Sequence, residues 1–173
     1  MMFKILAILF FYFLCGIPQL SAQIMADSIP FKIQLLNNQN VTTLRSEKNV
    51  TFEDVKDLTN WKPYDSSYIA SKVESIWLKF KIKNRSQDSV KVYLHSLTDY
   101  THIYQQVYSD YKIFKNGFYI PLIERTNNIE RIFTKLRFTP FQESEIYVRL
   151  DIHTDPILTK PHMYSERAYW EVS

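Results

Sequence analysis

The sequence predicts an all-β fold, an antiparallel β-sandwich or jelly roll with one short N-terminal helix. Aromatic residues, which strands favour, are abundant: the 173 residues include 12 Phe, 12 Tyr and 3 Trp. Several segments alternate apolar and polar side chains with the period of two that a half-buried strand requires. About seven such segments follow one another at short spacing, as in sandwiches and jelly rolls. An immunoglobulin-like sandwich is the nearest alternative.

The first 22 residues have the layout of a secretory signal peptide. Lys4 precedes an apolar run over residues 5 to 16, and the small residues Ser21 and Ala22 follow a proline break. The run is short for a membrane span, so we expect cleavage after Ala22, with an uncleaved anchor as the alternative. Cys15 lacks the small preceding residue of a lipobox, so we expect it to leave with the signal peptide. The protein is therefore expected to be exported, to the periplasm or the extracellular face of a bacterial membrane.

The remaining chain, residues 23 to 173, has the size of one domain. Lys4 is the only charged residue of the signal segment, so the remainder has a net charge of +2, one below the +3 of the whole chain. This small charge gives no reason to expect a nucleic-acid partner. The remainder lacks cysteine, which suits an exported bacterial protein stabilised by packing. Its single glycine, Gly117, excludes glycine-rich phosphate or dinucleotide sites, and it has no second apolar segment of membrane-spanning length.

Residues 23 to 47 are expected to form a lead-in with one edge strand near 31 to 36, and residues 48 to 171 the jelly-roll domain. The domain begins with a short helix within 49 to 58. Thr51 can cap it, and Asp54 stands at the reciprocal position of a capping box. So short a helix must dock on the sheet through the apolar side chains of one face, Phe52, Val55 and Leu58.

Alternation predicts further strands at 75 to 84, 90 to 97, 100 to 109, 131 to 138 and 145 to 152, with one more before the C-terminus. Asn116 and Gly117 can both adopt positive φ, so a tight two-residue hairpin turn is predicted there.

Trp77 breaks the otherwise clear pattern of the strand at 75 to 84. Ile76 and Leu78 belong to its apolar face, whereas Trp77 lies on the charged face with Lys79. Either a second layer of protein covers that end of the sheet, or a ligand stacks on the ring.

Sugar sites on sandwich proteins combine aromatic rings with side chains that hydrogen-bond hydroxyl groups. The strand faces turned away from the core offer such a set, and these are the candidate ligand-binding residues: Trp77, Lys79, Tyr93, His95, Arg131, Tyr147, Arg149 and Asp151. The alternative is that the aromatic members pack beneath the helix or a loop and enlarge the core.

Catalysis has less support in the sequence. The four histidines show no metal-binding spacing, and the loose pair of His153 and Asp155 is better explained as surface residues. No metal, cofactor or catalytic residue is expected. A small glycan-active hydrolase would need two carboxylates in one cleft, for which Glu145 and Asp151 are the available pair.

The order of segments resembles a known family. A helix-forming "VTFEDVKDL" precedes "WKPY", "SIWLKFKIKN", a central hairpin and "SEIYVRLDI". From about residue 48 to 171 this resembles the type 2 extracellular region of bacterial seven-transmembrane receptors with diverse intracellular signalling modules (7TMR-DISMED2). The residues that carry the likeness are Trp77, Leu78, Lys79, Phe80 and Asn84, and later Tyr147, Val148 and Arg149.

The resemblance implies a jelly-roll sensor that binds a carbohydrate or other small ligand and signals through a membrane receptor or kinase module. Two Asp-Ser-aliphatic sequences, at Ser28 and Ser89, match an O-glycosylation pattern of Bacteroidetes. The turn glycines common in such domains are nearly absent, and no membrane helices follow in this sequence. The alternative within binding proteins is a protein-interaction module that uses the same aromatic face.

Overall fold

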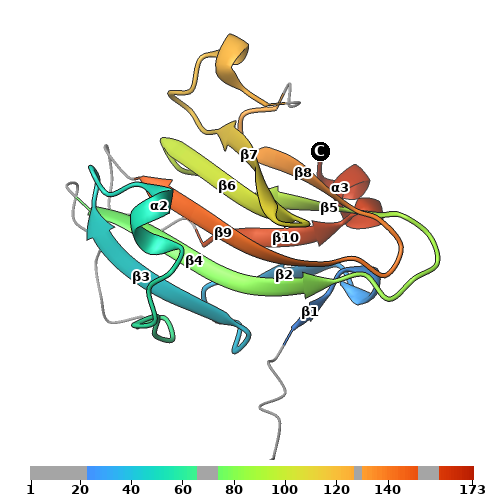
Figure 1. Cartoon of the computed structure of the whole chain (residues 1–173). Helices are drawn as coiled ribbons and strands as arrows, with labels where there is room; N and C mark the ends of the chain where they lie inside the picture. The colour runs from blue at the N-terminus through green and yellow to red at the C-terminus, as the bar shows by residue number, and fades with distance from the viewer. Residues whose placement is uncertain (1–22, 66–73, 127–129, 152–159) are drawn as a thin grey trace, which may run out of the picture.

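The computed structural model describes residues 23–65, 74–126, 130–151 and 160–173. They form two stacked β-sheets, which confirms the all-β sandwich predicted from the sequence (Figure 1). All strand pairs are antiparallel except β1 with β4. The lead-in contributes three strands to the two sheets, instead of the one edge strand that the sequence predicted.

The larger sheet has six strands in the order β1-β4-β9-β6-β7, with β3 also pairing with β4. Its strands are β1 (Ile24–Met25), β3 (Val41–Glu47), β4 (Glu74–Lys83), β6 (Tyr100–Val107), β7 (Asp110–Asn116) and β9 (Glu143–Asp151). One edge of β4 pairs with β9, and β3 and β1 share the other. β3 therefore forms an outer edge of the sandwich.

The smaller sheet has four strands in the order β2-β10-β5-β8. They are β2 (Lys32–Gln34), β5 (Val90–His95), β8 (Phe133–Phe138) and β10 (His162–Ser165). In Figure 1, β2 and β10 lie behind β4 and β9. Short 3-10 helices, η1 (Ala26–Ser28) and η2 (Leu122–Glu124), lie in the connections.

The central core lies between the two sheets. The apolar set of β4 is at most 2% exposed, and it clusters with inward side chains of the smaller sheet such as Leu94, Leu136 and Met163. Each fully buried side chain of this size contributes about 1.5–3 kcal/mol through the hydrophobic effect. The alternation predicted for these strands is therefore confirmed.

Helix α2 (Phe52–Val55) is shorter than the segment predicted. The backbone nitrogen and hydroxyl group of Thr51 both donate to the Asp54 carboxylate, at 2.8 and 2.6 Å, which confirms the reciprocal contact of the capping box. Phe52 and Val55 are buried, but Leu58 is 41% exposed. Its predicted docking role is wrong because the helix ends one turn too early to turn this side chain toward the sheet.

The hairpin predicted at Asn116 and Gly117 is also wrong. β6 and β7 form the hairpin instead, and it turns at Tyr108 and Ser109, where Tyr108 adopts a φ of 59°. Gly117 follows β7 with a φ of 129°. A Cβ atom there would lie 2.4 Å from the carbonyl oxygen of Asp99, so close backbone approach, together with the positive φ, requires the glycine.

A second helix, α3 (Glu166–Val172), follows the predicted last strand and was not predicted. The Ser165 hydroxyl caps it by accepting from the backbone nitrogen of Ala168 at 3.3 Å. The Tyr169 ring stacks on Tyr93 of β5 at 3.8 Å between centroids. Helix α3 therefore covers part of the outer face of the smaller sheet, as α2 covers part of the larger one.

Candidate functional site

The eight candidate residues do not form one surface. Five lie on the outer face of the larger sheet, in register on β4 and β9: Trp77, Lys79, Tyr147, Arg149 and Asp151. Tyr93 and His95 lie on the outer face of the smaller sheet, and Arg131 precedes β8. The two groups face opposite ways because the outer faces of two stacked sheets point away from each other.

Trp77 lies within a covered aromatic layer. It is 0% exposed and Tyr147 is 1% exposed. Phe52 of α2 stacks on Tyr104 at 4.1 Å and meets the Tyr147 ring edge-on at 5.2 Å. The indole nitrogen of Trp77 donates to the Ser46 hydroxyl at 3.0 Å. Of the two alternatives raised by the sequence, the structure therefore has the second layer of protein over this ring.

Arg149 fastens that layer in place. Its guanidinium donates to the backbone carbonyls of Lys48 at 2.5 Å and Val50 at 3.0 Å, just before α2. It also donates to Asp151 at 2.9 Å, and only 14% of its side chain is exposed. Three of its donor groups are thus used within the protein, and the side chain acts here as a clamp on the segment that covers Trp77.

Lys79 and Tyr147 are paired around Glu145. The Lys79 ammonium lies 3.4 Å from the Glu145 carboxylate and 5.0 Å from the centre of the Tyr147 ring. The Tyr147 hydroxyl donates to Glu145 at 2.6 Å. Burial, together with this hydrogen bond, raises the pKa of Tyr147, so its hydroxyl group stays protonated.

The two carboxylates considered for a hydrolase are far apart. Glu145 and Asp151 lie on the same face of β9, six residues from one another. At roughly 3.4 Å per residue they are separated by about 20 Å along the strand. Glycosidase carboxylates lie roughly 5–9.5 Å apart, so this pair cannot act on one glycosidic bond.

Tyr93 and His95 are partly covered on the other side of the sandwich. Tyr93 is 6% exposed beneath Tyr169, and the His95 ring lies 4.8 Å from Phe133. Arg131 is exposed, and its backbone carbonyl accepts a hydrogen bond from Gly117.

Among the residues that the structure describes, no three His, Cys, Asp or Glu side chains are grouped so as to hold a metal ion. His153 and Asp155 lie outside the described ranges.

A pocket of about 580 Å³ opens at the edge of the larger sheet formed by β3 and β4. We call it the β3–β4 pocket. Most of its lining is polar, and its polar and charged residues are Thr43, Arg45, Asn60, Lys62, Tyr64, Asp65 and Glu74. Its volume falls within the range of roughly 300–1,000 Å³ that is usual for small-molecule sites.

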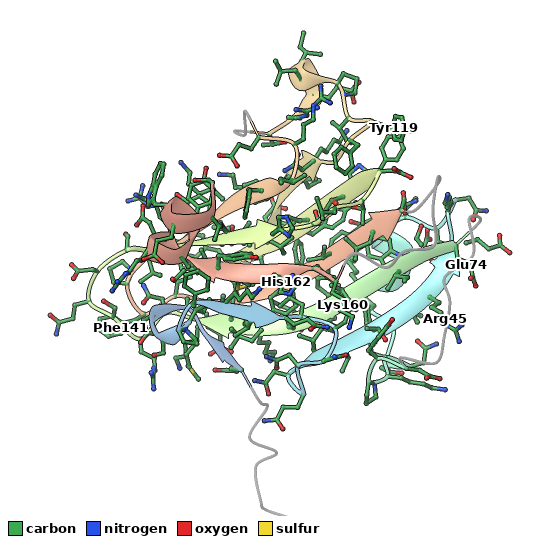
Figure 2. The ribbon with its side chains drawn as sticks, turned by 180° about the vertical axis from the view of Figure 1, so that it is seen from behind. Arg45, Glu74, Tyr119, Phe141, Lys160 and His162 are labelled. Carbon is green, nitrogen blue, oxygen red and sulfur yellow. The ribbon has the colours of Figure 1, made fainter. Side chains whose placement is uncertain are left out.

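Strand pairing explains how these residues meet. Arg45 of β3 pairs with Ile76 of β4, and Glu74 lies two residues from Ile76 on the same face. Thr43 and Lys62 exchange backbone hydrogen bonds of 2.6 and 3.0 Å, which hold the segment 60–65 against β3 as a second wall. Figure 2 shows Arg45 and Glu74 near one another at this edge, away from His162.

None of the eight candidate residues lines the β3–β4 pocket. The sequence "NWKPYD" at 60 to 65 carries one detectable signal, two aromatic rings among polar side chains after a helix. The contribution of Arg45 and Glu74 depends on the register of β3 with β4, which no local pattern reveals.

None of the helices within the described ranges has the length and apolar character needed to cross a membrane.

Comparison with known proteins identifies the family. A search of curated proteins finds no match to the chain. The family model described as 7TMR-DISM extracellular 2 matches residues 38–165, and it confirms the resemblance seen in the sequence. The chain therefore belongs to the 7TMR-DISMED2 family, an extracellular sensor region of seven-transmembrane receptors.

Proposed function

We propose that this extracellular sensor region binds a carbohydrate, or a similar polyhydroxylated small ligand, in the β3–β4 pocket. Binding there serves as the input to a membrane signalling receptor. Family membership supports the sensor role, and the pocket supports the class of ligand. This pocket is separate from the covered aromatic layer around Trp77.

The lining of the pocket carries the proposal. Glu74 and Asp65 supply carboxylate acceptors, Arg45 supplies guanidinium donors, and Asn60 supplies both kinds of group. Sugar hydroxyls donate and accept at the same atom, so a mixed set of this kind suits them better than a set of one type. Tyr64 adds an aromatic ring that is half-buried against the central core and held in place by it.

The covered layer supports the pocket from the other side of the sheet. Leu44 and Trp77 pair across β3 and β4 and point to the outer face, opposite to Arg45 and Ile76. Packing of the aromatic layer therefore fixes the strands from which the pocket residues project. A rigid support of this kind lowers the conformational entropy lost when a ligand binds.

A glycan array followed by calorimetry on the purified protein tests the proposal. Arg45→Gln and Glu74→Gln should each weaken binding of an identified sugar by about tenfold or more, because each removes a charged hydrogen-bonding group. Glu143→Gln is the matched control, since this carboxylate of β9 pairs with Lys83 of β4 and lies outside the pocket. The melting temperature of each variant checks that it is folded.

Either of two results would overturn the proposal. One is an array on which no neutral or acidic glycan binds. The other is a sugar whose affinity is the same for the native protein, Arg45→Gln and Glu74→Gln.

A further inference from the structure

Four side chains form a continuous row across the outer face of the smaller sheet. Strand register places them directly opposite one another in successive pairs, from β2 through β10 and β5 to β8: Gln34, His162, His95 and Phe133. We call this the histidine row. The rings of the two histidines lie 6.4 Å apart, and none of the four residues lines the β3–β4 pocket.

The histidine row contains two polar atoms that the described protein leaves unsatisfied. Nε2 of Gln34 and Nδ1 of His95 are shielded from solvent, and neither has a hydrogen-bond partner. Buried polar groups are nearly always paired, so two orphaned atoms in one row, on the strands β2 and β5 that flank β10, need an explanation. The Gln34 nitrogen is a donor, and Nδ1 of His95 becomes a donor when the ring is protonated.

The charges around the histidine row are positive. Lys32 lies two residues before Gln34, and Lys160 two residues before His162; both lysines are exposed. Figure 2 shows Lys160 and His162 near one another on this side of the molecule. The other titratable groups on this face are Lys91, Tyr93, Lys135, Arg137, Tyr164, Tyr169, Glu130 and Glu166. Of the two carboxylates, Glu166 is paired with Lys91 at 2.7 Å, and Glu130 accepts a hydrogen bond from the Tyr169 hydroxyl.

Both histidines are neutral in the free protein near pH 7. Burial lowers the pKa of His95, and the neighbouring His162 and Lys32 lower it further. Burial also lowers the pKa of His162, and the charges of Lys32 and Lys160 act in the same direction. No carboxylate contributes to either shift.

We propose that the histidine row is an anion-binding site that takes a carboxylate or sulfate group and that gains a proton on His95 when the anion binds. When the Gln34 and His95 side chains turn their shielded nitrogens toward solvent, the anion bridges β2 and β5 above His162. It then accepts hydrogen bonds from Nε2 of Gln34 and from the protonated Nδ1 of His95, and Lys32 and Lys160 supply further positive charge. The proton comes from solvent and forms one N–H bond on the ring. Phe133 and Tyr164, whose rings lie 4.8 and 6.0 Å from His95, provide an apolar wall for the rest of the ligand. The flanking ammonium groups disfavour a metal cation at the same place.

This site does not depend on the β3–β4 pocket, and its signature is a dependence on pH. An anion stabilises the protonated ring, so linkage requires the affinity to rise as pH falls toward the pKa of the free histidine. Uptake of one proton changes the affinity by up to about tenfold per pH unit in that interval.

Calorimetry on the purified protein with sodium sulfate, glucuronate and glucose tests the proposal at pH 5.5, 6.5 and 7.5. We expect sulfate or glucuronate to bind at least about tenfold more tightly at pH 5.5 than at pH 7.5, with the uptake of one proton. The comparison of sulfate with glucuronate identifies the preferred anion. The ring resonances of His95 in NMR spectra should titrate at higher pH when the anion is bound.

His95→Gln should remove the pH dependence and weaken anion binding by about tenfold or more. His102→Gln is the matched control, because His102 is a partly buried histidine of the larger sheet whose Nδ1 is also unpaired. If the melting temperature shows that His95→Gln is unfolded, the exposed Lys32→Gln gives the second test, with weaker anion binding expected.

Three results would overturn the proposal: no anion bound at pH 5.5, an anion affinity independent of pH, or binding unchanged by His95→Gln. Binding of neutral glucose that is lost in Glu74→Gln and independent of pH would support the β3–β4 pocket alone. The two proposals can therefore fail separately.

Discussion

Replacement of Trp77 by alanine should destabilise the fold strongly, because the structure gives this side chain a packing role. The ring is 0% exposed, stacks on Tyr104 at 6.0 Å and donates to Ser46 at 3.0 Å. The Arg149 guanidinium lies 5.6 Å from its centre. Deletion of so large a buried ring leaves a cavity that the rigid strands β3, β4 and β9 cannot close.

Truncation of a buried aromatic residue to alanine costs about 3–5 kcal/mol. The free energy of unfolding of a domain is about 5–15 kcal/mol, so Trp77→Ala removes a large share of the stability. At roughly 2–4 °C per kcal/mol for a protein of this size, we expect the melting temperature to fall by about 6–20 °C.

Urea unfolding followed by circular dichroism measures this change, and Trp170→Ala is its matched control. Trp170 is 68% exposed on α3, so its removal should change stability by less than about 1 kcal/mol. Equal melting temperatures for the two variants would refute the assignment of Trp77 to a covered layer. Loss of ligand binding in a fully stable Trp77→Ala protein would refute it as well.

Two further changes test the same face of the sheet. Arg149→Ala should cost about 3–5 kcal/mol in urea unfolding, because it leaves the buried Asp151 carboxylate without its charged partner and with only the Ser75 hydroxyl donating to it. Arg85→Ala, which breaks an exposed pair with Asp27, should cost less than about 1 kcal/mol. Equal losses for the two variants would contradict the clamp. Burial lowers the pKa of His102 below 6.5, so the unfolded chain binds a proton more readily and stability should fall as pH drops through about 6.5. His102→Gln should reduce the loss of melting temperature between pH 7.5 and 5.5, and an unchanged slope would disprove this effect.

The strands were predictable because their faces have unequal environments. Ile76 and Leu78 must point to the central core, and a period of two follows directly from that requirement. The same pattern could not say what covers the other face of β4, since the cover comes from residues 48 to 55, which meet Trp77 only in the folded chain. The capping contact of Thr51 with Asp54 was predictable because it is local.

The mistaken hairpin shows the limit of residue preferences at turns. Asn-Gly is a favourable turn sequence, yet Gly117 serves close approach to Asp99, and the true turn accepts a tyrosine at positive φ. The register of β6 with β7 pairs Thr101 with Asn116, so Asn116 lies at the end of a strand and not in the turn. Helix α3 was missed although Ser165 is a favourable capping residue, because seven residues are too few for a clear helical period.

The candidate site was the least predictable part of the molecule. Aromatic and charged side chains at alternate positions gave a reasonable set of surface residues, but alternation cannot tell an exposed outer face from one covered by a helix. The β3–β4 pocket requires three segments distant in sequence, and the histidine row requires the register of four strands.

The short helix α2 is the part of the larger sheet's cover that is expected to open before the strands. Helix α2 has four residues and is attached to the larger sheet by the aromatic layer and by the Arg149 clamp, whereas β4 is hydrogen-bonded on both edges. Segments with few backbone partners exchange their amide protons and reach proteases at a lower free energy than the strands beneath them. Transient release of residues 48 to 58 therefore exposes Trp77 and Tyr147 while the central core stays closed. This aromatic layer is therefore the first apolar surface that becomes accessible to proteases, chaperones or other copies of the domain.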